Sequence, residues 1–158
     1  MIKIGFLTLI ALCTLSLPPV LAAEFDGSIT GKARVVSADT IVIGNAKIKL
    51  ADLEGLGPKQ SCFFENQILP CGRIASDALH STIADKNITC ALKGANIYSV
   101  LLAECRMDNT NLNAWLVKSG WAFSDSVYQA EQKQAQSEKS GAWRFQFIFP
   151  EKWRDGNY

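Results

Sequence analysis

The chain has 158 residues, of which 16 are basic, 15 are acidic and 48% are hydrophobic. This length suits one domain with a real hydrophobic core. The formal net charge of +1 argues against a protein that grips nucleic acid mainly through its phosphates, because that grip relies on a basic excess that releases counterions. Any contact with nucleic acid is therefore expected to be local or weak.

Residues 1–23 are expected to be a secretory signal peptide. Lys3 supplies a positive start, an uncharged apolar run extends from Ile4 to Leu17, and cleavage is expected after Ala22 or Ala23. The run is too short to cross a bilayer comfortably, so an uncleaved anchor is the less favoured alternative. Loss of Lys3 leaves 15 basic and 15 acidic residues. We expect a secreted or periplasmic monomer without membrane association, formed by one domain over residues 24–158.

The four cysteines after the leader are expected to form two disulfides, because an oxidising compartment favours paired thiols. Four cysteines allow three pairings. Their spacing favours Cys62–Cys71 across a loop and Cys90–Cys105 between two neighbouring strands. A zinc site is the alternative, but no two of these cysteines are two to four residues apart, as structural zinc ligands usually are.

Three strands are predicted in succession after the leader. Residues 29–36 suit a strand, residues 40–43 resume the pattern after a break at Ser37-Ala38-Asp39, and residues 47–53 alternate apolar and polar side chains. These segments form a meander with short turns. Residues 55–70 show no clear periodicity and are expected to be a loop.

The hydrophobic period changes after Gly72. Ala75, Leu79 and Ile83 recur every fourth residue, which predicts a helix that ends near Asp85. The segments that follow are two strands over residues 87–92 and 98–106, a helix that begins after the turn at 108–111 and ends at Gly120, and a polar helix over 128–139. This order predicts a mainly β, α+β fold, namely a five-stranded barrel of the oligonucleotide- and oligosaccharide-binding type with about three helices.

Motifs are spread along most of the expected domain, from about Gly31 to Arg154. They read "SADTIVI", "IKLADLEGLG", "QSC", "PCGRIA", "VLLAEC", "NLNAWLVKSGWAF", "GAW" and "FPEKWR". In this order and spacing they resemble the staphylococcal-nuclease-like, or thermonuclease, family in its secreted, disulfide-containing bacterial form. The resemblance implies metal-dependent hydrolysis of phosphodiester bonds in DNA or RNA. It also implies a site with two arginines on the phosphate, a glutamate that activates water, and calcium held by acidic residues.

The calcium positions of the family are partly retained. Asp39, followed by Thr40, matches the calcium-binding acidic residue at the strand break. Glu54 falls at the family's second calcium-binding aspartate, but its side chain is one methylene longer. The resemblance implies a calcium site at Asp39, Thr40 and Glu54, and the longer side chain of Glu54 predicts that calcium binding there is weak or absent. The alternative is that these are turn carboxylates, which satisfy backbone donors.

The groups that would act on the phosphate are not retained. Lys49 falls at the first phosphate-binding arginine and lacks the planar fork of a guanidinium. Gly57 falls at the water-activating glutamate, and Val100 falls at the second arginine, while Tyr98 of the same turn is kept. Lys49 and Tyr98 are thus the remaining phosphate-binding candidates, and no catalytic residue is expected among Lys49, Gly57 and Val100.

Three functions follow from these residues. Loss of a general base typically costs about 10²–10⁴ in rate, so the first is a catalytically impaired family member, a pseudoenzyme. It would bind an anionic or oligomeric ligand, including nucleic acid weakly, or an unknown protein. The second is an active calcium-dependent phosphodiesterase in which Asp52 or Glu65 replaces the base. The third is an accessory structural protein.

His80 is expected to be a surface residue, since no cluster of possible metal-ligand or catalytic side chains accompanies it.

Overall fold

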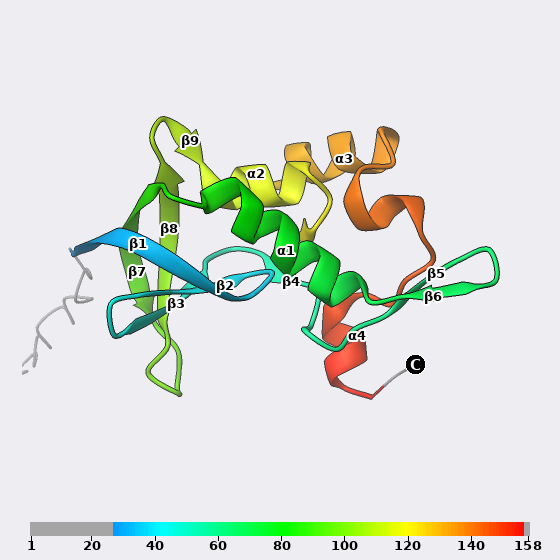
Figure 1. The fold of residues 1–158 in the computed structure, drawn as a ribbon, viewed down its shortest axis with the longest axis horizontal. Coiled ribbons are helices and arrows are strands. Elements are labelled where there is room, and N and C mark those ends of the chain that lie inside the picture. Colours follow the sequence, from blue (N-terminus) through cyan, green and yellow to red (C-terminus); the bar gives the residue numbers. More distant parts are fainter. Residues whose placement is uncertain (1–26, 157–158) are drawn as a thin grey trace, which may run out of the picture.

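The structure is a computed structural model that describes residues 27–156, so the expected signal peptide and its cleavage site lie outside the described residues. Within this range no helix is long and apolar enough to cross a membrane. Figure 1 shows the elements, which in chain order are β1 (Ser28–Ser37), β2 (Thr40–Ile43), β3 (Ala46–Leu50), β4 (Glu54–Gly55), β5 (Cys62–Phe64), β6 (Gln67–Leu69), α1 (Cys71–Ile83), β7 (Asn87–Ala95), β8 (Leu101–Met107), β9 (Thr110–Asn111), α2 (Leu112–Lys118), β10 (Ala122–Phe123), α3 (Gln129–Ser137), the 3-10 helix η1 (Gly141–Arg144) and α4 (Pro150–Arg154).

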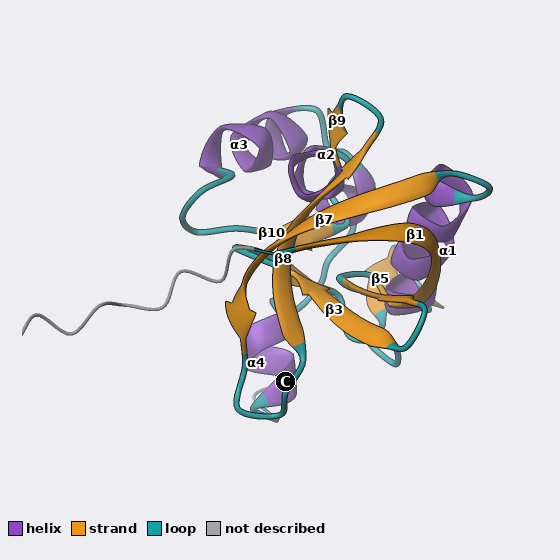
Figure 2. Ribbon diagram, turned by 90° about the vertical axis from the view of Figure 1, so that its left-hand side faces the viewer, coloured by secondary structure: helices purple, strands orange, loops and turns teal. Residues whose placement is uncertain are grey.

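Five strands close into a barrel, which confirms the predicted fold. The sheet order is β3-β2-β1-β7-β8-β9, in which β9 is a two-residue strand, and β3 also pairs in parallel with β8 through partners that include Leu50 and Ala103. The pairing of β3 with β8 closes the five longer strands into the barrel. Figure 2 shows the strands with α1 and α2 packed around them and α3 beyond α2.

The barrel encloses the main hydrophobic core. Strand alternation places Ile41, Ile48 and Ile88 inside, each with no exposed surface, and α1 adds Leu79. A second cluster lies beside the barrel and joins the first turn of α1 to β10 and the C-terminal segment; it contains Leu56, Cys62, Cys71, Ala75, Phe123 and Ala142. Packing in this second cluster brings the C-terminal segment next to one end of the barrel. We call this end, which contains the turns at Asp39 and Asp52, the barrel mouth.

Both predicted disulfides are present. Cys90 and Cys105 are direct partners in the β7–β8 ladder, with Cα atoms 4.0 Å apart. Cys62 and Cys71 join β5 to the first residue of α1, with Cα atoms 5.6 Å apart. The first bond fastens the barrel wall, and the second fastens a hairpin to the helix that covers the core.

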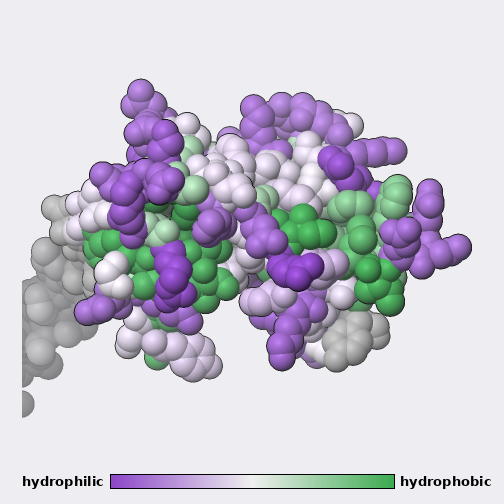
Figure 3. Space-filling view, viewed as in Figure 1, coloured by the Kyte–Doolittle hydropathy of each residue, from purple (hydrophilic) through white to green (hydrophobic). Residues whose placement is uncertain are grey.

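Part of the region from 55 to 70, predicted to be a loop, contains regular structure. β4 pairs with β10, and β5 pairs with β6 in a hairpin whose cross-strand partners include Phe63 and Ile68. Phe63 also exchanges two backbone hydrogen bonds with Gln146. The prediction failed because Phe63 and Ile68 are exposed by 44% and 68%. The hairpin therefore has no buried face that would produce a regular hydrophobic period in the sequence. Figure 3 shows hydrophobic side chains among hydrophilic ones at the right-hand end of the molecule, where the hairpin lies.

Other boundaries also differ from the prediction. β3 ends at Leu50 rather than Leu53, because the chain turns at Asp52, where φ is +61°. β8 begins at Leu101 rather than Tyr98, because the Asn96 side chain accepts hydrogen bonds from the backbone of Tyr98 and Val100 and so makes a turn. Residues 27–156 contain four α-helices, one more than expected; the additional helix, α4, is only five residues long.

Candidate functional site

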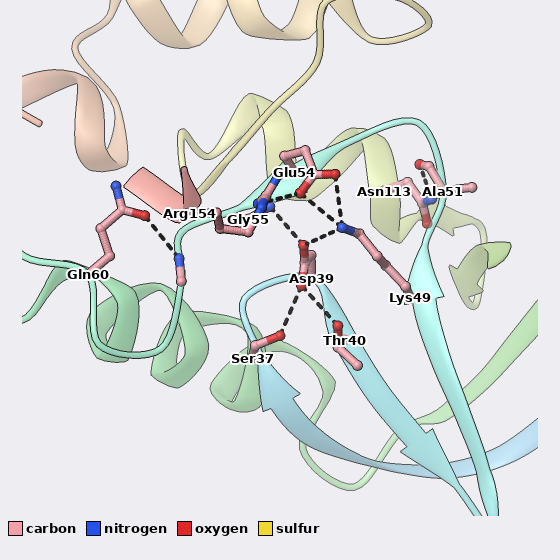
Figure 4. Close-up of polar contacts among 11 residues, drawn as sticks. Ser37, Asp39, Thr40, Lys49, Ala51, Glu54, Gly55, Gln60, Asn113 and Arg154 are labelled. Atoms are coloured by element: carbon pink, nitrogen blue, oxygen red, sulfur yellow. Dashed lines mark hydrogen bonds and ion pairs between the residues drawn. The ribbon is translucent and has the colours of Figure 1, made fainter. Parts of the chain in front are cut away.

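The break between β1 and β2 positions a buried carboxylate at the barrel mouth. Ser37 and Thr40 are cross-strand partners, so Asp39 lies in the tight turn between them. Its Oδ1 accepts hydrogen bonds from both hydroxyls at 2.9 Å, and its Oδ2 accepts one from the backbone N–H of Gly55 at 3.0 Å (Figure 4). Both carboxylate oxygens are therefore held by protein donors.

The environment of Asp39 keeps it ionised. Burial by itself raises the pKa of this carboxyl, because it removes water from the charged form. The Lys49 ammonium and the hydrogen bonds from Gly55, Ser37 and Thr40 outweigh burial, so the pKa lies below the usual aspartate value. Asp39 is thus a fixed negative charge with a fixed positive neighbour.

Lys49 provides that neighbour and also binds a second carboxylate. It is the cross-strand partner of Thr40, so its side chain begins beside the turn that holds Asp39. Its Nζ lies 3.5 Å from Oδ2 of Asp39 and 2.9 Å from each oxygen of Glu54. An ammonium group therefore stands between the two carboxylates that the sequence predicted as calcium ligands (Figure 4).

A second cation, which comes from the C-terminal helix α4, contacts the carboxylate of Glu54. Nη1 of Arg154, on α4, lies 2.9 Å from Oε2 of Glu54, the oxygen that Lys49 also contacts. The two residues are 100 positions apart in the sequence. Asp39, Lys49, Glu54 and Arg154 thus form one ion-pair network in which two negative and two positive charges balance.

α4 also covers Gly57, the position where the resemblance implies a water-activating glutamate. A Cβ atom at Gly57 would come within 2.7 Å of the Trp153 ring, so this ring lies directly on the glycine. Gln60, which is fully buried, accepts a hydrogen bond from the Gly57 N–H and donates one to the backbone oxygen of Ile148. These contacts fix the turn at Gly57 and the segment that leads to Pro150 against one another.

The remaining predicted positions lie apart from the network. Tyr98 is 80% exposed and lies with Val100 in the turn between β7 and β8, where neither side chain has a hydrogen bond or ion pair within residues 27–156. Glu65 lies at the turn of the β5–β6 hairpin. His80 is exposed on α1, as predicted. Asp52 is the one alternative base that shares a hollow with Lys49 and Glu54.

That hollow is a groove of about 580 Å³ beside the ion-pair network. Its charged lining consists of Lys49 and Lys93 against Asp52, Glu54 and Asp125. Phe123 and the serines at positions 124 and 126 add apolar and hydroxyl surface. A lining with charges of both signs and no positive excess suits an oligomer that is uncharged or carries charges of both signs. It suits a polyanion that lies along the groove less well.

Asn113 holds backbone segments next to the groove in place. It is fully buried on α2, and its Oδ1 accepts the backbone N–H of Cys105 at 3.0 Å. Its Nδ2 donates to the backbone oxygens of Ala51 and Ala103 at 3.0 and 3.1 Å. One amide side chain therefore holds the end of β3, the middle of β8 and α2 together, directly before the turn at Asp52.

The residues present do not fit a calcium ion. Calcium takes six to eight oxygen ligands, whereas no group of three or more metal-ligand side chains occurs among residues 27–156. The oxygens of Asp39 and Glu54 are already bonded, and an ammonium lies between them. Asp39, Thr40 and Glu54 are brought together as the sequence predicted, but as a protein-satisfied ion-pair network.

Sequence reasoning did not place Arg154, Trp153 or Asn113 at the barrel mouth. The first two lie in the "FPEKWR" motif, which carried the resemblance but gave no contact, because they reach the mouth only through tertiary packing. Asn113 did leave a signal. It is spaced three and four residues from Leu116 and Val117, so a polar residue lies on the apolar face of α2.

Comparisons with known proteins agree with the fold. The family model for staphylococcal nuclease homologues matches residues 47–144. A protein of Rhizobium meliloti named succinoglycan biosynthesis protein ExoI is 29% identical over 126 residues, which cover 75% of this chain and 66% of that protein. A protein of Haemophilus influenzae named an uncharacterized endonuclease is 29% identical over 131 residues, which cover 77% and 70% of the two chains. The chain thus spans about two thirds of the length of these curated relatives.

Proposed function

Because the chain belongs to the staphylococcal nuclease homologue family, we propose that it is an exported member that binds an oligomeric ligand at the barrel mouth and does not cleave it efficiently. Residues 1–23 act as the signal peptide in this proposal. The two disulfides support it, since such bonds persist in oxidising compartments.

The observation that carries the proposal is the position of Lys49. Its ammonium is bonded to Glu54 and lies 3.5 Å from Asp39, so the charge that could face a phosphate is already neutralised. Phosphodiester cleavage needs uncompensated cations where negative charge develops, and a base that takes a proton from water. Gly57 offers no carboxylate, and the Trp153 ring covers it.

The groove beside the network supports the binding half of the proposal. Its volume of about 580 Å³ is within the range of sites for small ligands or one unit of an oligomer. The name of the Rhizobium relative refers to succinoglycan biosynthesis, and a lining with polar groups and charges of both signs suits the hydroxyl groups of a glycan. Nucleic acid is bound weakly, if at all, through the small number of cations at the mouth.

A nuclease assay tests the proposal. The mature protein is incubated with single-stranded DNA, double-stranded DNA and RNA, with calcium and with chelator. We expect no cleavage above that of a mock preparation. Cleavage that is abolished both by chelator and by Asp39→Ala would overturn the proposal, because it would require a working metal site.

An active phosphodiesterase is the second candidate. Arg154 favours it, because it restores a guanidinium to the mouth that the sequence alone had not placed there. The relative named an endonuclease also favours it. The same assay separates the two functions. A third possibility, an accessory structural protein without a small ligand, predicts no thermal shift with nucleotides, calcium or oligosaccharides.

A further inference from the structure

Arg154 differs from the other cation of the network in how many of its hydrogen-bond donors are used. Lys49 has three donors, and three carboxylate oxygens surround it at 2.9, 2.9 and 3.5 Å. Arg154 has five donors, and within residues 27–156 its guanidinium makes a single hydrogen bond, to Oε2 of Glu54. Its side chain is 46% exposed. The guanidinium therefore presents unused donors to solvent at the edge of the mouth.

Arg154 lines a small hollow at the mouth, and its carboxylate partner Glu54 lines the neighbouring groove. The hollow has a volume of about 250 Å³ and is lined by Arg154, Lys49, Asp39 and Ser37 together with residues 55–58. One oxygen of Glu54 accepts from both cations at 2.9 Å. Since each cation lies this close to one oxygen, a phosphate-type oxyanion in place of the Glu54 carboxylate could contact both of them.

We propose that Arg154 is the anion-binding residue of this mouth, and that Glu54 occupies its site as an internal competitor until a phosphate-type oxyanion displaces it. α4 holds Arg154 in position, because Trp153 packs on Gly57 and Pro150 is buried. The inference deepens the proposed function, on which it rests, by naming the group that receives one anionic unit of the ligand. A single guanidinium recognises one such unit, which agrees with a groove that lacks positive excess.

Binding of inorganic phosphate tests the residue without any oligomer. The probe is the side-chain Nε–Hε resonance of Arg154 in nuclear magnetic resonance spectra, recorded for the wild type, Glu54→Gln and the control Lys152→Gln. Lys152 is an exposed cation on the same helix with no ion pair within the described residues. We expect phosphate to shift the Arg154 resonance, with an affinity about tenfold or more higher in Glu54→Gln, because the competing carboxylate is gone. Lys152→Gln should match the wild type.

Binding of a short single-stranded oligodeoxynucleotide, measured by fluorescence polarisation with chelator present, tests the same residue on an oligomer. Arg154→Gln should lower the affinity about tenfold, and Arg154→Lys should restore little of it, because an ammonium lacks the planar fork. Far-UV circular dichroism and thermal unfolding report whether each variant is folded. If Arg154→Gln is unfolded, Arg154→Lys and Glu54→Gln carry the test.

The outcomes separate this inference from the proposed function. No phosphate-dependent shift at Arg154 in either the wild type or Glu54→Gln would overturn the inference, as would an equal loss of affinity in Arg154→Gln and Lys152→Gln. If the wild type binds an oligomer and Arg154→Gln binds it equally, the proposed function stands and the inference fails. If phosphate binds at Arg154 and neither the oligodeoxynucleotide nor an oligosaccharide binds the wild type, the inference stands and the proposed function fails.

Discussion

Replacing Lys49 by glutamine should convert the ion-pair network into a site that responds to calcium. The variant removes the ammonium that lies between Asp39 and Glu54, so that Arg154 is the one cation left in the network against two carboxylates. Two like charges in a partly buried site repel each other and favour a bound cation. The stability of the wild type should not respond to calcium, because the ion would have to displace the Lys49 ammonium, which is part of the same chain.

The size of both effects follows from the geometry. Breaking a fully buried ion pair costs about 3–5 kcal/mol, but Lys49 and Glu54 are 26% and 39% exposed, so a loss of about 1–3 kcal/mol is expected at pH 7. A site with few carboxylates binds calcium with a dissociation constant of about 1 mM. At about 10 mM calcium, binding would then return about 1.4 kcal/mol.

Urea unfolding followed by far-UV circular dichroism measures these quantities, with and without 10 mM calcium (about ten times the dissociation constant above). Lys47→Gln is the matched control, since Lys47 is an exposed lysine on the same strand. It should change neither stability nor calcium response. The reasoning is refuted if calcium stabilises the wild type as much as Lys49→Gln, or if Lys49→Gln gains nothing from calcium.

Three further predictions concern stability. Asn113→Ala should cost about 2–5 kcal/mol in urea unfolding, because it leaves two buried backbone groups without partners; a loss no larger than that of the exposed Asn87→Ala would contradict this. The lowered pKa of Asp39 implies stability that is full above the unfolded value of about 3.9 and is lost as the pH falls through the folded value; Asp39→Asn should therefore flatten the fall in unfolding free energy below pH 4 (about the unfolded value), and an unchanged slope would count against it. Replacing Cys62 and Cys71 by serine should lower the unfolding free energy by about 2–3 kcal/mol, whereas an unchanged value would show that the hairpin is held by its other contacts.

The sequence predicted those elements whose stability comes from a regular buried face. The barrel strands and α1 alternate or repeat in ways that burial requires, and they were located to within a few residues. The β5–β6 hairpin escaped prediction because its stability comes from a disulfide and from pairing with Gln146, which are not local patterns. Likewise, the sequence identified Asp39, Glu54 and Lys49 as a group, but their mutual distances, and the arrival of Arg154, depend on tertiary packing.

The β5–β6 hairpin bears on self-association. Gln146 pairs with β5 on one side, and within residues 27–156 no strand pairs with β6 on the other. An open edge with an exposed isoleucine can template the addition of another chain. Here the edge is three residues long and ends beside the charged Glu65, two features that limit such growth. A longer apolar hairpin at this position would lose the short edge and would therefore be more prone to aggregate.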